Sequence, residues 1–256
     1  MFLPIRDENP QLDTPWVTYA IIALNVLVWL LLQGAGQEPA LTKSVCTFGV
    51  IPADLFGQLP ETARVACPMD GQPDWHTLLT SMFMHGSWMH LLGNMWIFWI
   101  FGNNIEDSMG HWRFALFYLL CGLLADAAHI VVDPASISPT VGASGAIYGV
   151  LGAYLVLYPR VHVHMLVFWF TFAVPAVAVL LLWIAFDVFG GLSNLGIRGG
   201  GVAHWAHIGG FFAGMLTVFV FKDEALLARH PYRGWQQREH PDNRWKRVQG
   251  KRGSWH

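Results

Sequence analysis

GASGAIYGVLG, residues Gly142–Gly152, begins an apolar run that continues to Tyr158. Its glycines leave one face of a helix with almost no side-chain bulk, so that a second helix can approach closely. A polar group inside a membrane span is costly and usually functional. We therefore expect a short membrane helix over Gly142–Tyr158 in which the hydroxyl of Ser144, in the first turn, has a function.

The composition of the whole chain agrees with a membrane setting for this run. Of the 256 residues, 54% are hydrophobic and 12% are charged, and the mean hydropathy is +0.40. An ordinary soluble domain carries about 25% charged residues, so lipid is the expected solvent for most of this chain. The net charge of −2 argues against nucleic acid as a partner.

Six apolar runs are long enough to cross a bilayer. We expect each to be a helix, because a helix forms all of its backbone hydrogen bonds within itself. The sequence thus predicts an all-α membrane protein with six transmembrane helices, over Trp16–Gln33, Trp88–Ile105, Trp112–Val132, Gly142–Tyr158, Met165–Phe189 and Val202–Phe221. The first run lacks the flanks of a cleavable signal peptide, so we expect it to be retained.

The runs divide the chain into an N-terminal segment (1–15), a membrane domain (16–221) and a basic tail (222–256). Most Lys and Arg residues lie on the side of the termini, which predicts that both termini are cytoplasmic. The long loop 34–87 then faces outward, where a disulfide between Cys46 and Cys67 is permitted but not required. For the tail, contact with anionic headgroups and disorder both remain open.

Polar residues from distant parts of the chain are expected to meet near the outer leaflet. In the predicted topology the second, fourth and sixth helices all run inward, so their first turns lie at one depth. His90 and Asn94 begin the second helix, Ser144 begins the fourth, and His207 lies early in the sixth. Four such groups at one depth favour a single site over chance.

Small residues predict how the fourth and sixth helices meet. His207, Gly210 and Gly214 stand at i, i+3 and i+7, on one face of the sixth helix. If this face packs on the glycine face of the fourth helix, His207 reaches Ser144. A serine hydroxyl needs such a base before it becomes an effective nucleophile, and histidine has a pKa suited to that work.

Hydrolysis also needs donors for the oxyanion of the tetrahedral intermediate. His90 and Asn94, at i and i+4, can point at one spot, and the N–H of Ser144 at a helix N-terminus is a further donor. Each feature alone has a structural explanation: close packing for the glycines, a hydrogen bond to a carbonyl for His207, an interhelical clamp for His90 and Asn94. Their combination favours catalysis.

This pattern resembles the rhomboid family of intramembrane serine proteases over roughly Trp16–Phe221. The Gly-x-Ser-Gly of that family is here Gly142–Gly145, and its Ala-His-x-x-Gly-x-x-x-Gly is Ala206–Gly214. The His-x-x-x-Asn of the family is here His90 with Asn94, and its additional histidine is His85. Its tyrosine one turn past the serine is Tyr148, and its acidic-then-basic stretch after the second helix is Glu106–Arg113.

The resemblance implies a six-helix rhomboid-like bundle and a Ser144–His207 dyad without an obligatory aspartate. It assigns oxyanion stabilisation to His90 and Asn94 and helix packing to Gly210 and Gly214. Supporting roles fall to His85, Tyr148, Gly142 and Gly145. It further implies cleavage of single-span membrane proteins near the outer leaflet, a water-filled cavity at the serine, and a substrate helix that unwinds locally. The fifth span with the loop Gly190–Gly201 is the expected gate.

Other ionisable residues are harder to assign. Asp126 and Asp187 lie near the outer ends of the third and fifth spans, and an aspartate close to His207 would complete a triad. We favour instead that Asp126 and His129, at i and i+3, satisfy one another. His162 and His164 are expected to be solvated, and Trp and Phe near span ends to be interfacial anchors. We expect no metal and no cofactor.

Rival functions are a metalloprotease, an aspartyl protease, a small transporter or channel, and a rhomboid-like protein that binds membrane clients without cutting them. The chain has no His-Glu-x-x-His, no inverted repeat of broken helices, and it keeps both serine and histidine. We expect a bacterial plasma-membrane enzyme with membrane proteins and lipid as partners. Substrate identity and oligomeric state stay open.

Overall fold

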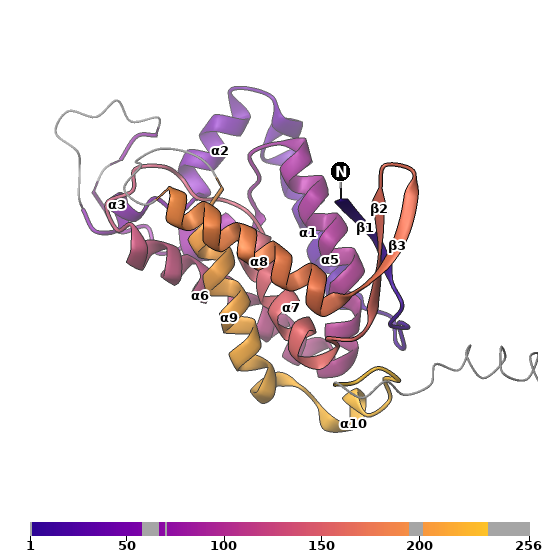
Figure 1. Cartoon of the computed structure of the whole chain (residues 1–256). Helices are drawn as coiled ribbons and strands as arrows, with labels where there is room; N and C mark the ends of the chain where they lie inside the picture. The colour runs from indigo at the N-terminus through magenta and orange to yellow at the C-terminus, as the bar shows by residue number, and fades with distance from the viewer. Residues whose placement is uncertain (1, 58–66, 70, 195–201, 235–256) are drawn as a thin grey trace, which may run out of the picture.

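In the computed structural model, long helices form one bundle with short elements at both ends (Figure 1). The structure describes residues 2–57, 67–69, 71–194 and 202–234. The predicted tail beyond residue 234, with Trp235, Trp245 and Trp255, and most of the predicted gate loop lie outside these residues. The long helices are α1 (Trp16–Leu31), α5 (Trp88–Met109), α6 (His111–Val132), α7 (Ser144–Leu157), α8 (Ala176–Ser193) and α9 (His204–Phe221).

Three of these helices, among the residues that the structure describes, are both long and apolar enough to cross a membrane: α6, α8 and α9. The apolar helices α1 and α7 are shorter, with 16 and 14 residues. Helix α5 has 22 residues but carries Glu106 and Asp107 in its last turns. The structure therefore supports a helical membrane domain, while the count of six spans stays a prediction.

The fold is not all-α, which corrects the predicted class. Strands β1 (Phe2–Asp7), β2 (His162–Val167) and β3 (Phe170–Pro175) form an antiparallel sheet in the order β1-β2-β3. The predicted fifth span, Met165–Phe189, is accordingly wrong at its start, because its helix begins only at Ala176. Aromatic and β-branched residues dominate the run before Pro175 and favour strands. An apolar run alone does not separate the two cases.

The loop between α1 and α5 is built from short helices rather than extended chain. They are η1 (Gly34–Gly36), α2 (Ala40–Phe48), α3 (Pro52–Leu55), α4 (Thr77–Thr80) and η2 (Ser81–Phe83). The pairing that the sequence left open is present, since Cys46 and Cys67 form a disulfide. Cys121 is a buried free thiol. The loop thereby places η2 directly before α5, beside the start of α7.

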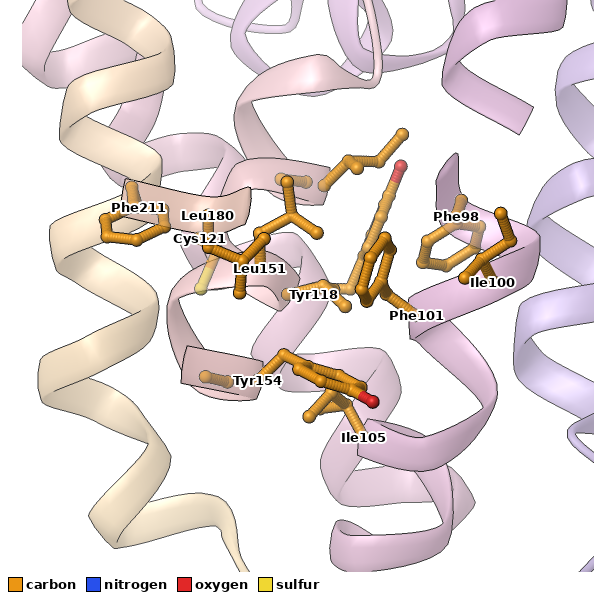
Figure 2. Close-up of a cluster of buried hydrophobic side chains, with 14 of the residues drawn as sticks. Phe98, Ile100, Phe101, Ile105, Tyr118, Cys121, Leu151, Tyr154, Leu180 and Phe211 are labelled. Atoms are coloured by element: carbon orange, nitrogen blue, oxygen red, sulfur yellow. The ribbon is translucent and has the colours of Figure 1, made fainter. Parts of the chain in front are cut away.

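Helix α7 occupies the centre of the bundle, and its neighbours approach it closely. A Cβ atom on Gly210 of α9 would lie 2.0 Å from the carbonyl oxygen of Gly145, and one on Gly214 would lie 1.9 Å from that of Gly149. These glycines therefore let the two backbones touch. Around α7, buried aromatic and aliphatic side chains from α5 to α9 fill the core (Figure 2).

The segment between β1 and α1 and the segment after α9 both dock at the end of the bundle where α5 and α7 finish. The Arg229 guanidinium, just after α10 (Glu224–Leu227), lies 2.6 and 3.1 Å from the carboxylate oxygens of Asp13. The Glu106 carboxylate accepts hydrogen bonds from the N–H groups of Val17 and Thr18 and so caps the start of α1. The starts of α5, α7 and α9 lie at the other end.

Candidate active site

Ser144 is the first residue of α7, and the backbone before it is shaped by Gly142. Gly142 adopts a φ of 132°, a conformation that other residues rarely take. Its N–H donates to the carbonyl of Ser81 at 2.9 Å, and a Cβ here would lie 2.8 Å from the His90 ring. The serine is thus presented by a turn that only glycine fits.

His207, in the first turn of α9, lies directly over Ser144. The distance from His207 Nε2 to Ser144 Oγ is 2.8 Å. The Tyr148 ring stacks on the imidazole with 4.2 Å between ring centroids and 6° between planes. The close approach of Gly210 to the Gly145 carbonyl sets this geometry, since a side chain at Gly210 would separate α9 from α7.

An acidic residue completes the contacts of this imidazole. Asp187 of α8 has its Oδ1 atom 2.9 Å from His207 Nδ1 and 2.8 Å from His204 Nδ1. The hydroxyl of Tyr148 donates to its second oxygen, Oδ2. The sequence offers Asp187, like Asp126, as a candidate third member of a triad with His207 and does not decide between them. It does not predict His204.

The remaining predicted residues of the second helix lie beside this group. Asn94 Nδ2 is 3.1 Å from His85 Nε2, and the His85 and His90 rings meet edge to face at 5.0 Å. The side-chain amide of Gln33, which the sequence analysis missed, exchanges two hydrogen bonds with the backbone of His85, at 2.7 and 2.9 Å. These contacts hold the His85 segment against the start of α5.

A cavity of about 320 Å³ opens beside the serine. Polar groups line it at one end and apolar side chains of α5, α7 and α8 line the rest: Asn94, Ile97, Ser144, Ile147, Tyr148, Leu151, Trp183, Phe186, Asp187 and His204. A volume of this size admits several water molecules or a few side chains. The serine hydroxyl is thus accessible from between α5 and α8.

Two predictions about other ionisable residues need correction. Asp126 and His129 do not satisfy one another: Ser81 Oγ lies 3.4 Å from the Asp126 carboxylate, and Thr140 Oγ1 lies 3.0 Å from His129 Nε2. Ser81 and Thr140 are thus the hydrogen-bond partners of Asp126 and His129, and the sequence alone did not place them there. The side chains of His162 and His164 are not fully solvated either.

Both of these histidines are half-buried and face a residue of the N-terminal segment. His164 Nε2 lies 3.1 Å from one Glu8 carboxylate oxygen, and His162 Nδ1 lies 3.6 Å from the other. The pairing of β1 with β2 brings Glu8 to them. Their partner was therefore invisible to a prediction that treated residues 1–15 as a separate segment.

This chain is similar to known proteins over most of its length. The model of the Rhomboid domain matches residues 72–224. RHOMBOID-like protein 7 of Arabidopsis thaliana is 34% identical over 203 residues, which cover 79% of this chain and 56% of that protein. Rhomboid protease GluP of Bacillus subtilis (strain 168) is 32% identical over 206 residues, which cover 79% of this chain and 35% of GluP.

More distant similarity extends to mitochondrial proteins. Rhomboid protein 1, mitochondrial, of Saccharomyces cerevisiae is 26% identical over 206 residues, covering 78% of this chain and 51% of that protein. The chain thus spans about a third to about half of the length of these three relatives.

Proposed function

This chain belongs to the rhomboid family and is an integral membrane protein, and we propose that it is an intramembrane serine endopeptidase. In this proposal Ser144 is the nucleophile and His207 the general base. The observation that carries it is the 2.8 Å distance between Ser144 Oγ and His207 Nε2, at the wall of an open cavity. That distance is within the range required for proton transfer between nucleophile and base.

The chemistry follows from these positions. Ser144 Oγ attacks the carbonyl carbon of the substrate while its proton passes to His207 Nε2. The tetrahedral intermediate carries an oxyanion, for which His90, Asn94 and the N–H of Ser144 are the proposed donors. His207 then protonates the leaving amine. Water entering through the cavity releases the acyl group, and its proton returns through His207 to Ser144.

The proposed substrates are single-span membrane proteins, cut near the outer leaflet. The cavity lies between α5 and α8 and is lined largely by apolar side chains, which suits a segment arriving from lipid. A helix hides its peptide bonds inside its own hydrogen-bond ladder, so the segment must unwind before attack. Helix-destabilising residues such as glycine near the cut site favour this step.

We also propose six spans with both termini cytoplasmic, in a bacterial plasma membrane. The segment before α1 and the segment after α9 dock at one end of the bundle, which supports placing both termini on one side of the membrane. The membrane itself rests on the compact layout alone, since the relatives come from a bacterium, a plant and yeast mitochondria.

The test is cleavage of a labelled single-span protein in proteoliposomes, together with labelling by a fluorophosphonate. We expect wild type to cleave and to be labelled at Ser144. The variants Ser144→Ala and His207→Ala should each lose at least about 1000-fold in kcat, because nucleophile and base act as one unit. Cleavage by Ser144→Ala at the wild-type rate would refute the proposal.

A matched control lies at the other end of the bundle. Ser108 is buried, and its hydroxyl lies 2.5 Å from that of Tyr158. Ser108→Ala removes the same atom as Ser144→Ala and should lower stability by about 1 kcal/mol while cleavage persists. A wild-type protein that retains the labelled helix without cutting it would point instead to a binder of membrane clients.

A further inference from the structure

The carboxylate of Asp187 is the centre of a hydrogen-bond cluster drawn from three helices. Its partners are the Nδ1 atoms of His204 and His207 from α9, at 2.8 and 2.9 Å, and the hydroxyl of Tyr148 from α7. The side chain of Asp187 is 8% exposed and that of His207 is 12% exposed. Such contacts are stronger in a partly dry site than in water.

The packing of α8 on α9 makes this cluster possible. Gly190, one turn after Asp187, faces the His204 ring, and a Cβ there would lie 2.5 Å from its Cε1 atom. At the next position, a Cβ on Gly191 would lie 3.2 Å from the Trp205 ring. Gly190 therefore clears the space through which His204 reaches the carboxylate, and Gly191 makes room for Trp205. The glycine pair serves close packing of these two helices.

The cluster dictates which nitrogen of His207 carries the proton. An ionised carboxylate can only accept hydrogen bonds, so the Nδ1 atom that faces Asp187 must be the donor. Nε2 of a neutral imidazole is then the acceptor. That acceptor is the atom 2.8 Å from Ser144 Oγ. The carboxylate thus selects the tautomer that can take the proton of the serine.

We propose that Asp187 is a positioning residue that turns the serine–histidine pair into a triad. It holds His207 in the base-competent tautomer and orientation, and it stabilises the imidazolium that forms when Ser144 attacks. His204 and Tyr148 fix the carboxylate in turn. This inference rests on the proposed function and departs from the dyad that the family resemblance implies.

Asp126, the other aspartate considered for this role, does not contact His207. Its carboxylate lies against Ser81, with 3.4 Å between the Ser81 hydroxyl and the nearer carboxylate oxygen. The two aspartates are both buried: 8% of the whole Asp126 residue and 6% of the whole Asp187 residue are exposed. They are therefore a matched pair in which one carboxylate faces the base and the other does not.

The experiment compares Asp187→Asn with Asp126→Asn in the full chain. We expect Asp187→Asn to lower kcat at least about 100-fold, by analogy with the loss when a triad aspartate becomes an amide. KM and the thermal midpoint should change little, because the amide keeps the shape. Asp126→Asn should lower kcat less than about threefold.

A spectroscopic measurement separates positioning from a purely structural role. In protein labelled with ¹⁵N-histidine, the Nδ1–H signal of His207 should be downfield in wild type and should move in Asp187→Asn. His204→Asn retains a donor to the carboxylate and should keep more activity than His204→Leu. An Asp187→Asn enzyme with wild-type kcat, or with the His207 signal unmoved, would overturn the inference.

The two proposals fail separately. If wild type and Ser144→Ala cleave equally, the proposed function is wrong whatever Asp187 does. If wild type cleaves, Ser144→Ala does not, and Asp187→Asn matches wild type, only the triad is wrong. Equal losses of kcat in Asp187→Asn and Asp126→Asn would also reject it, because the effect would then not depend on facing His207.

Discussion

Helix α7 carries the same pair twice: a tyrosine that donates to an aspartate of a distant segment. Near its start Tyr148 donates to Asp187 of α8, and near its end Tyr154 donates to Asp7 of β1. At the first pair the carboxylate also meets two histidines, one of which lies on Ser144, and a cavity opens beside it. At the second pair Tyr154 is fully buried.

The second pair belongs to a network that ties the segment before α1 and the segment after α9 to the bundle. Its polar groups fasten β1, the start of α1 and the segment after α10 to the ends of α5 and α7: Asn9, Asp13, Asn104, Glu106, Asp107, Ser108, Tyr158, Arg229 and His230. Buried polar groups therefore do not mark a site in this fold by themselves. A site needs, in addition, a nucleophile, a base and access.

Removing each tyrosine hydroxyl tests this distinction with the largest expected effect on kcat. Tyr148→Phe should lower kcat about tenfold with little change in stability, because the ring still stacks on His207 while Asp187 loses a donor. Tyr154→Phe should cost about 2 kcal/mol of stability and leave kcat nearly unchanged, because it strips a donor from a buried carboxyl. Cleavage kinetics and thermal unfolding measure both; equal effects on kcat would break the comparison.

The buried Tyr154–Asp7 pair should also make the stability of the protein depend on pH. Burial raises the pKa of the Asp7 carboxyl to about 7, against an ordinary value of 3.8. A carboxyl with a raised pKa in the folded state costs stability as pH rises from about 4 to about 7. Asp7→Asn does not titrate, so this loss should be absent from the variant.

The expected result is that the stability of Asp7→Asn relative to wild type rises between pH 5 and pH 8, by about 2 to 3 kcal/mol. Thermal unfolding at the two values measures it. Burial also lowers the pKa of His230 to about 4, and comparing the variant with wild type cancels that contribution. A constant difference at both pH values would contradict the burial of an ionisable Asp7.

The smallest effect on stability is expected for the exposed Arg229–Asp13 ion pair at the same end of the bundle. Arg229 and Asp13 are about half exposed, at 44% and 48%, and exposed ion pairs contribute little and are screened by salt. Arg229→Gln should lower the thermal midpoint slightly at low salt and not at all at high salt. A large, salt-independent loss would show that the pair is a main attachment of the C-terminal segment.

Sequence patterns predicted helix contacts best where one face of a helix consists of small residues. The glycines of α7 and α9 could be assigned to a contact because only small residues allow such an approach, and Ser144 and His207 followed from their places in these helices. The β-hairpin after α7 was missed because its apolar strands resemble the start of a span. Tryptophan and phenylalanine suit both a membrane helix and a strand.

Other parts of the site had no local signal. Gln33 lies more than 50 positions before His85, whose backbone it holds. Glu8, at the start of the chain, pairs with histidines after α7. Such pairs depend on long-range packing, and no periodicity in either segment predicts the partner of the other.

By itself, the sequence determined that this chain is a helical membrane protein with a serine and a histidine on helices that can pack closely. Hydropathy and glycine spacing are properties of residues close together in the sequence, so they can be recognised without knowledge of the fold. The tertiary structure alone decided that Asp187, and not Asp126, faces His207. That choice depends on the rotation and crossing of α8 against α9, which the contact of Gly190 with His204 fixes.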